Sequence, residues 1–362
     1  MQMRGSTGVV SSHNEWDPLE EVIVGIVDGA AVPQWHPTLP VTMPRDQWPF
    51  FRENGGRPFP QEKIDAARQD LEGLVHLLEA EGVTVRRPEV RDFARPYSTP
   101  EWTSAGGLYA AMPRDLLLVV GDEIIESPVA WRSRYFDVHA FRPLLKEYFQ
   151  RGARWTSAPM PQLSDALYRP DRAAAEEERE AEEFDPVITE IEPTFDAADF
   201  MRMGRDLFVQ QSHVTNRFGI EWMRRHLGPG YRVHVLPVRD AHPMHIDASF
   251  IPLAPGKLLV NTERVPQLPP MFRGWDVIPA PPPEMPAGTT LYMTSRWISI
   301  NLLSLDGERV LIEKHEDGLA RLLKEHGFKP IRCPFTNFYP FGGSFHCATL
   351  DVRRRGELQS YF

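Results

Sequence analysis

Four short polar clusters interrupt apolar stretches of this chain, and each holds side chains that can transfer protons, bind a cation or attack a substrate. The clusters are MPRD with Asp115, FDAADF with Asp196 and Asp199, PMHID with His245 and Asp247, and GGSFHC with Cys347. Taken singly, the aspartates suit turns or helix caps, the histidine a surface or packing position, and the cysteine a buried apolar position. Their meaning depends on whether the fold brings them together.

Cys347 is one of only two cysteines in 362 residues. It could be a buried apolar residue, a metal ligand or a nucleophile, and a nucleophile needs both access and a raised thiolate fraction. Gly342 and Gly343 just before it allow the backbone to approach a substrate closely. Cys333 lacks such a setting and is interpreted as a packing residue. His346 is interpreted as a neighbour of the nucleophile without a role of its own.

His245 and Asp247 alternate, so on an extended segment their side chains would face the same side. Such a pair could place an imidazole and a carboxylate on one substrate. Metal binding is the alternative interpretation of this segment. Since His242, His245 and Asp247 are crowded together and no second ligand cluster occurs elsewhere in the sequence, we expect no metal site.

Together, the carboxylates, the histidine and the cysteine match the requirements for attack on a guanidinium group. The guanidinium carbon is flat, cationic and poorly electrophilic, so paired carboxylates must hold the group while a thiolate attacks it. An acid such as histidine must then protonate the departing amine. We therefore expect the four clusters to form one site.

The elements that must position these clusters are short and spread along the whole chain. Strand patterns occur at 20–27, 83–87, 115–127, 231–238, 257–262, 298–305, 309–313 and 345–353. Amphipathic helix patterns, each closed by a glycine, occur at 61–82, 219–228 and 318–327. Strand pairs alternate with single helices without a long linker. This order predicts one α/β domain over residues 1–362, built of ββαβ-like units.

Composition excludes several classes of function. A net charge of −10 argues against a nucleic-acid partner, and two cysteines cannot form a disulfide framework. No apolar stretch approaches the length of a membrane span and the amino end lacks a signal-peptide pattern, so we expect a cytoplasmic protein. The acidic stretch at 171–185 predicts an exposed helix or a flexible surface insert.

The chain resembles the arginine:glycine amidinotransferases, which belong to the guanidine-modifying pentein superfamily. The resemblance covers nearly the whole chain, and its phrases fall in family order: SSHNEWDPLEEVIVG, MPRD, EIIESPVAWRSR, FDAADF, GIEWMRRHL, PMHID and FHCATLDVRRRGELQSY. It implies a five-bladed α/β propeller (the pentein fold), with ββαβ units around a central active-site channel. It also implies an enzyme that needs no cofactor or metal and forms a homodimer.

The same resemblance implies a role for individual residues. Cys347 would be the nucleophile, His245 the general acid and base, and Asp196 the carboxylate that orients His245. Asp115 and Asp247 would hold the guanidinium nitrogens. The remaining implied contacts are Arg264 for the substrate carboxylate, Thr294 and Ser295 as paired hydroxyls, and Met244 and His242 in the acceptor region.

These roles imply ping-pong transfer of the amidino group of L-arginine, through Cys347, to glycine or a related primary amine, with release of L-ornithine. One departure makes the acceptor uncertain, because His242 replaces an asparagine of the glycine enzyme. Lysine, an amino-cyclitol or another amine of natural-product biosynthesis is the alternative acceptor. An arginine deiminase or dihydrolase, in which water replaces the amine, is a further alternative, and a non-catalytic arginine-binding relative is the last.

Overall fold

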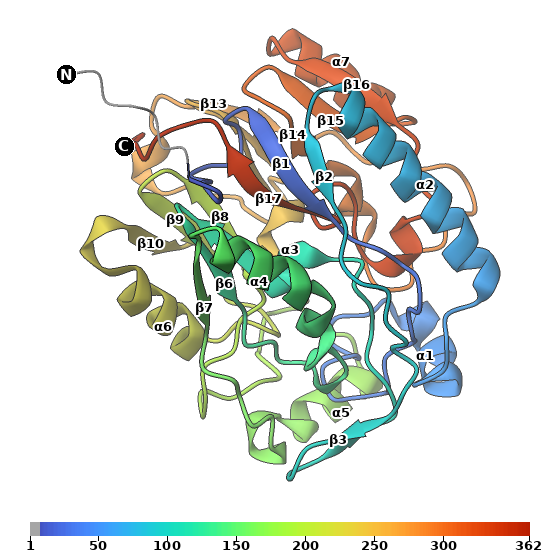
Figure 1. Cartoon of the computed structure of the whole chain (residues 1–362). Coiled ribbons are helices and arrows are strands. Elements are labelled where there is room, and N and C mark those ends of the chain that lie inside the picture. Colours follow the sequence, from blue (N-terminus) through green and yellow to red (C-terminus); the bar gives the residue numbers. More distant parts are fainter. Residues whose placement is uncertain (1–7) are drawn as a thin grey trace.

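The computed structural model describes residues 8–362, which form an α/β fold (Figure 1). Five three-stranded sheets with the same strand arrangement make up its framework. In each sheet, a central strand pairs antiparallel with one neighbour and parallel with the other. The strands of these sheets are β1 (Leu19–Val24), β2 (Thr84–Arg86), β5 (Leu117–Val120), β6 (Glu123–Glu126), β7 (Arg154–Ser157), β8 (Phe200–Met203), β9 (Asp206–Val209), β10 (Arg232–Val235), β11 (Phe250–Ala254), β12 (Lys257–Val260), β13 (Asp276–Pro279), β14 (Leu303–Ser304), β15 (Arg309–Glu313), β16 (Lys329–Cys333) and β17 (Thr349–Arg354). A separate two-stranded ribbon pairs β3 (Tyr97–Ser98) with β4 (Thr103–Ser104).

A helix connects the central strand to its parallel neighbour in four of these sheets, because parallel strands need a crossover connection. The connecting helices are α2 (Gln61–Ala80), α4 (Arg142–Gln150), α6 (Arg217–Leu227) and α7 (Asp317–Glu325). The remaining helices are α1 (Trp48–Asn54), α3 (Pro113–Leu116) and α5 (Pro170–Glu178). The ββαβ order predicted from the sequence is thus confirmed in three sheets, and a fourth has the same arrangement with β17, from the end of the chain, as its antiparallel strand. Between β12 and β13 the connection contains only a short 3-10 turn at Pro270–Phe272.

The two ends of the chain meet in one sheet. Strand β17 pairs antiparallel with β1, with Val22 opposite Asp351 and Val24 opposite Thr349. In Figure 1 the red β17 lies directly beside the blue β1. This pairing fixes the position of the turn just before β17, which carries Cys347.

The helix predictions at 61–82, 219–228 and 318–327 are confirmed within two residues. Gly82 and Gly327 follow α2 and α7 with φ values of 84° and 87°, a left-handed conformation that glycine adopts without steric cost.

Three strand predictions extend too far. The 3-10 turn Arg296–Ile300 overlaps the start of the segment predicted at 298–305, so that only Leu303–Ser304 is a strand. The strand predicted at 345–353 begins at Thr349, because the Ala348 amide bonds back to the Ser344 carbonyl at 2.8 Å and closes a turn. At 115–127, Asp115 lies on the helical turn α3, which Pro113 starts with its fixed φ.

In residues 8–362, no helix is both long and apolar enough to cross a membrane.

Candidate active site

Cys347 lies in a buried turn whose conformation is fixed by one side chain. The Asn301 side-chain oxygen accepts hydrogen bonds from the amides of Ser344 (3.2 Å) and Cys347 (3.1 Å). Gly343 has no room for a side chain, since a Cβ there would lie 2.7 Å from the Cβ of Cys347 and 2.5 Å from the Met112 sulfur. The Cys347 thiol is 2 % exposed, and its Sγ lies 3.4 Å from Oδ2 of Asp247. Sequence reasoning missed Asn301, which lay inside an expected strand.

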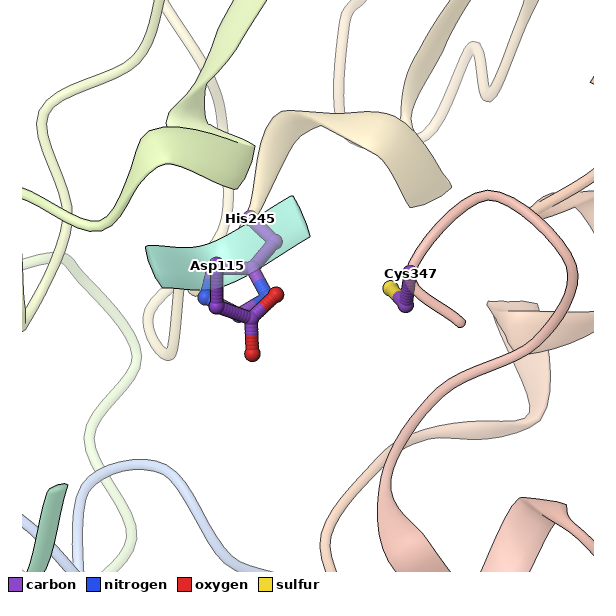
Figure 2. A group of neighbouring side chains, drawn as sticks. All are labelled: Asp115, His245 and Cys347. Carbon is purple, nitrogen blue, oxygen red and sulfur yellow. The ribbon is translucent and has the colours of Figure 1, made fainter. Parts of the chain in front are cut away.

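His245 points into the same space as Cys347, although it comes from a different segment (Figure 2). Its φ of 63° is costly for a residue with a Cβ and is the kind of strain that surrounding structure must impose. The segment is therefore not extended, and the prediction that His245 and Asp247 simply alternate on one side is wrong. The two side chains still meet around Cys347, because the turn at Ile246–Ala248 redirects the backbone.

Two carboxylates contact the His245 ring. Nε2 lies 3.0 Å from Oδ2 of Asp196, and Nδ1 lies 3.6 Å from Oδ1 of Asp115. Burial alone would lower the pKa of His245, but the charge of Asp115 and the hydrogen bond to Asp196 raise it well above its usual value. The ring is therefore positioned and protonated as an acid requires.

The two carboxylate oxygens of Asp115 differ, because only one of them has a hydrogen-bond partner. Its Oδ2 accepts a hydrogen bond from Nη1 of Arg134 at 2.7 Å. Its Oδ1 is buried and has no hydrogen-bond partner within residues 8–362. Leaving a buried acceptor unpaired costs about 1–3 kcal/mol. A guanidinium N–H would satisfy it, which fits the predicted role of Asp115.

Arg134 is a member of the site that sequence reasoning did not single out. It is buried beside Asp115, and its Nη1 also lies 3.6 Å from Oδ2 of Asp196. Burial would lower its pKa, but Asp115 and the other nearby acids raise it, so the guanidinium stays charged. This charge offsets two neighbouring carboxylates. No signal in the sequence separates this arginine from a surface one.

The five other predicted substrate contacts all line one cavity of about 270 Å³: Met244, His242, Arg264, Thr294 and Ser295. Arg264 is held by an ion pair from its Nε to Asp240 at 2.9 Å, and its Nη2 donates to the Ser295 hydroxyl at 3.1 Å. Met293 also lines this cavity, and a Cβ on Gly342 would lie 2.9 Å from the Cβ of Met293. The cavity therefore adjoins the loop that carries Cys347.

The acidic stretch at 171–185 forms part of the cavity wall, and the prediction of an exposed helix or flexible insert is wrong for three of its residues, Arg172, Ala173 and Glu176. Arg172 and Glu176 on α5 are buried, and Glu176 is only 1 % exposed. The Glu176 carboxylate forms a hydrogen bond with Nε2 of His242 and an ion pair with Nη2 of Arg172, each at 2.9 Å. Burial would raise the pKa of Glu176, but these two partners lower it. Charge pairing therefore lets an acidic helix pack inward.

Ligand atoms of Asp115, His245 and Cys347 all lie within 4.8 Å of one another, close enough to share a metal ion. Against the expectation from sequence, potential metal ligands from three distant segments do converge here. The same three groups suit guanidinium chemistry. The absence of a metal requirement stays a prediction.

The thiol of Cys347 is not activated in the free protein. Burial raises its pKa to about 12, with a further contribution from the charge of Asp247, against a partial lowering by the hydrogen bond with His245. The sequence interpretation expected a raised thiolate fraction. The site instead lowers the thiolate fraction, mainly through burial.

We expect the rate at which a small alkylating reagent modifies Cys347 to rise about tenfold per pH unit between pH 7 and pH 10, because only the thiolate reacts. Peptide mapping by mass spectrometry would follow Cys347 separately from Cys333, with Cys347→Ser as the blank. A rate that levels off below pH 9 would show that the thiol has an ordinary or lowered pKa.

No model of a protein family matches the chain. Among characterised relatives, it is 56 % identical over 355 residues to the L-arginine:L-lysine amidinotransferase of Pseudomonas savastanoi pv. phaseolicola, covering 98 % of this chain and 97 % of the relative. It is 48 % identical over 358 residues to the mitochondrial glycine amidinotransferase of Danio rerio, covering 98 % of this chain and 85 % of the relative. Among solved structures, SxtG, an amidinotransferase of the saxitoxin pathway from Microseira wollei, matches with a TM-score of 0.89 and 50 % identity, covering 98 % of this chain and all of that one.

Proposed function

The chain belongs to the amidinotransferase family of the pentein superfamily, and we propose that it moves the amidino group of L-arginine to a primary amine through Cys347. The observation that carries this proposal is the convergence of Cys347, His245 and Asp115 around one space, with an unpaired carboxylate oxygen facing it. A cationic, planar group with several N–H donors fits that space.

In the first half-reaction, Asp115 and Asp247 hold the guanidinium of arginine. The bound cation offsets the two carboxylate charges that raise the pKa of the Cys347 thiol, so the thiol gives its proton to solvent and the thiolate forms when substrate is present. Sγ then bonds to the guanidinium carbon, and the bond from that carbon to the side-chain nitrogen breaks. His245, oriented by Asp196, gives its proton to the departing nitrogen. Ornithine leaves, and the amidino group stays on sulfur.

The far end of arginine is held in the cavity. Arg264 is fixed by Asp240 and points an N–H toward the Ser295 hydroxyl, so its guanidinium and the hydroxyls of Ser295 and Thr294 form a set of donors for the substrate carboxylate. Fixing both ends of arginine keeps its guanidinium carbon in line with Sγ.

In the second half-reaction, the acceptor amine enters the emptied cavity. It gives a proton to His245 and attacks the amidino carbon, and the carbon–sulfur bond breaks to release the Cys347 thiolate. His245 thus first donates a proton and then accepts one. When the product leaves, the Cys347 thiolate takes up a proton from solvent, so each cycle restores the starting protonation state.

Glycine or a related primary amine is the acceptor class that the resemblance implies, and a larger amine such as lysine or an amino-cyclitol is the second candidate. One observation favours the second candidate. His242, which stands where the glycine enzyme has asparagine, is held against the cavity by Glu176, so an imidazole and a carboxylate replace a small amide in the wall. The L-lysine relative is also the more similar of the two relatives compared.

We expect His242→Asn to change acceptor choice without changing the reaction with arginine. Removing the imidazole opens space near Met244, so the ratio of kcat/KM for glycine to that for lysine should rise about tenfold, the effect of one altered polar contact. Ornithine release with a panel of amines measures this ratio. Ornithine formed in the first turnover, which precedes the acceptor, is the internal control. An unchanged ratio would remove His242 from acceptor selection.

The same assay separates transfer from hydrolysis. With arginine and no amine, a transferase should release at most one ornithine per active site. Sustained release of citrulline or urea without an amine would contradict transfer and support a hydrolase of the same superfamily.

We further propose the finer features that the sequence and the family resemblance imply. The five three-stranded sheets and the pairing of β17 with β1 support a five-bladed propeller around a central channel. We propose a single domain over residues 1–362, a cytoplasmic location and a homodimeric assembly.

A further inference from the structure

His346, the residue before Cys347, lies between two carboxylates. Its Nδ1 is 2.7 Å from Oδ2 of Asp247. On the other side of the ring, its Nε2 is 3.3 Å from Oε2 of Glu15. The ring is buried, and Glu15 comes from the amino-terminal segment, more than three hundred residues away in the chain. The sequence interpretation, which gave His346 no role, is therefore contradicted by these contacts.

The surroundings of both carboxylates lower their pKa values. Burial would raise the pKa of Glu15, but the charges of Arg202 and Arg114 lower it far below its usual value. Arg202 donates from Nε and Nη2 to the two oxygens of Glu15 at 2.7 and 2.8 Å. Burial would likewise raise the pKa of Asp247, but the hydrogen bond and charge of His346 lower it.

An ionised carboxylate only accepts hydrogen bonds, so each His346 nitrogen that faces one must carry a proton. A neutral imidazole has one N–H and would leave its other nitrogen facing an anion. The two contacts together therefore favour the doubly protonated, cationic form of His346.

We propose that Glu15 and His346 act as a positioning pair, in which His346, held between the two carboxylates, orients Asp247 to receive the substrate guanidinium. This inference rests on the proposed function, because it assigns Asp247 to guanidinium binding. His346 acts through Asp247 and touches neither the substrate nor the transferred group.

The arrangement solves an electrostatic problem of the site. Asp115, Asp196 and Asp247 approach one small space, and like charges favour protonation of one of them. Arg134 offsets the first two, and His346 offsets the third. Because the contacts from His346 and from the Cys347 thiol both reach Oδ2 of Asp247, Oδ1 is left for a guanidinium N–H.

Other charges also face the His346 ring. The charge of Arg114 opposes protonation of His346. Its Nη1 lies 3.5 Å from Oε2 of Glu15, and its Nε donates a hydrogen bond to the backbone carbonyl of His346 at 3.3 Å. Burial also opposes protonation, but Asp247 and Glu15 outweigh both and raise the pKa of His346. The contribution of the cation to arginine binding is therefore complete below that raised pKa and is lost as the pH rises through it.

The test is His346→Gln, which keeps an N–H donor for Asp247 but carries no charge. We expect the KM for arginine to rise about tenfold or more, the effect of losing a charged partner, while kcat at saturating arginine changes less than about threefold. The alkaline fall in kcat/KM for arginine that titrates with His346 should disappear from the variant. A purely structural role would lower the thermal stability and leave the KM and the pH profile of the folded fraction unchanged, and that result would overturn the proposal.

His226→Gln is the matched control. His226 also pairs with a buried glutamate, Glu123 at 3.1 Å, but on α6 and away from the site. It should show neither the KM increase nor the altered pH profile, and a KM increase equal to that of His346→Gln would overturn the proposal.

A second measurement uses the unmodified protein and does not depend on the folding of a variant. Nitrogen-15 NMR of the His346 ring, assigned through the backbone, should show both nitrogens protonated at pH 7 and above. A neutral ring at pH 7 would overturn the proposal. Failure of the proposed function looks different, because the unmodified protein would then form no amidino adduct with arginine, whatever the state of His346.

Discussion

Cys347→Ala is expected to abolish ornithine formation, with a fall in rate of roughly four orders of magnitude or more, because no other group in the site can carry the amidino group. Arginine should still bind, since the carboxylates of Asp115 and Asp247 and the Arg264 end of the cavity remain. Removing the thiol leaves a small space and keeps the hydrogen bond from the residue 347 amide to Asn301. Ornithine release and calorimetric binding of arginine, measured on the same preparation, check both halves of this prediction.

Cys333→Ala is the matched control. Cys333 is buried at the end of β16, and burial raises the pKa of its thiol to about 12. That thiol shares burial with Cys347 but has no histidine partner, so its removal should leave the rate within about twofold of the parent after correction for any unfolded fraction. Retention of the parental rate in Cys347→Ala would refute the nucleophile assignment.

His245→Gln is expected to lower kcat by about 10²- to 10⁴-fold, the usual contribution of a general acid and base. Glutamine can keep a hydrogen bond to Asp196, so the site should stay folded, but it cannot donate a proton to ornithine or accept one from the amine. Both half-reactions should slow, which distinguishes this variant from His242→Asn, where only the acceptor step changes. Rapid mixing with arginine, followed by mass analysis of the protein, measures the first half-reaction alone.

The role of His245 as an acid also predicts how the parent enzyme and His245→Gln differ in their pH dependence. Because the pKa of His245 is raised, the ring stays protonated across neutral pH, and the parent enzyme should lose its first half-reaction only as the pH rises through that pKa. The Gln variant should lack this alkaline fall. A variant rate within tenfold of the parent, or an identical pH profile, would contradict the assignment of His245.

Local patterns predicted much of the fold. The apolar stripes of α2, α6 and α7 and the glycines that follow them mark those helices, and the alternation of strand pairs with helices predicted the ββαβ order. The turn before β17 was missed for a physical reason. Phe345 and Cys347 alternate as they would in a strand, but the hydrogen bonds from the Asn301 side chain hold the backbone in a turn. A contact between residues more than forty positions apart is invisible to a local pattern.

In the candidate site, too, some residues were predictable from the sequence and others were not. The residue types at Cys347, His245 and Asp115 indicated a chemistry, and the structure brings the three together. Arg134, Glu176 and Glu15 were not predicted, because each resembles an ordinary solvated charge in the sequence. Their burial depends on ion pairs with distant partners, and only the folded chain shows those partners.

Intact-protein mass spectrometry after mixing with arginine alone tests the central claim most directly. The proposed chemistry predicts one added amidino group per chain, located on Cys347 by peptide mapping, formed together with one ornithine and removed when a productive amine is added. The same mass gain should be absent from Cys347→Ala. Amine-dependent ornithine formation by a protein that never carries the adduct, or an adduct on a residue other than Cys347, would contradict the account.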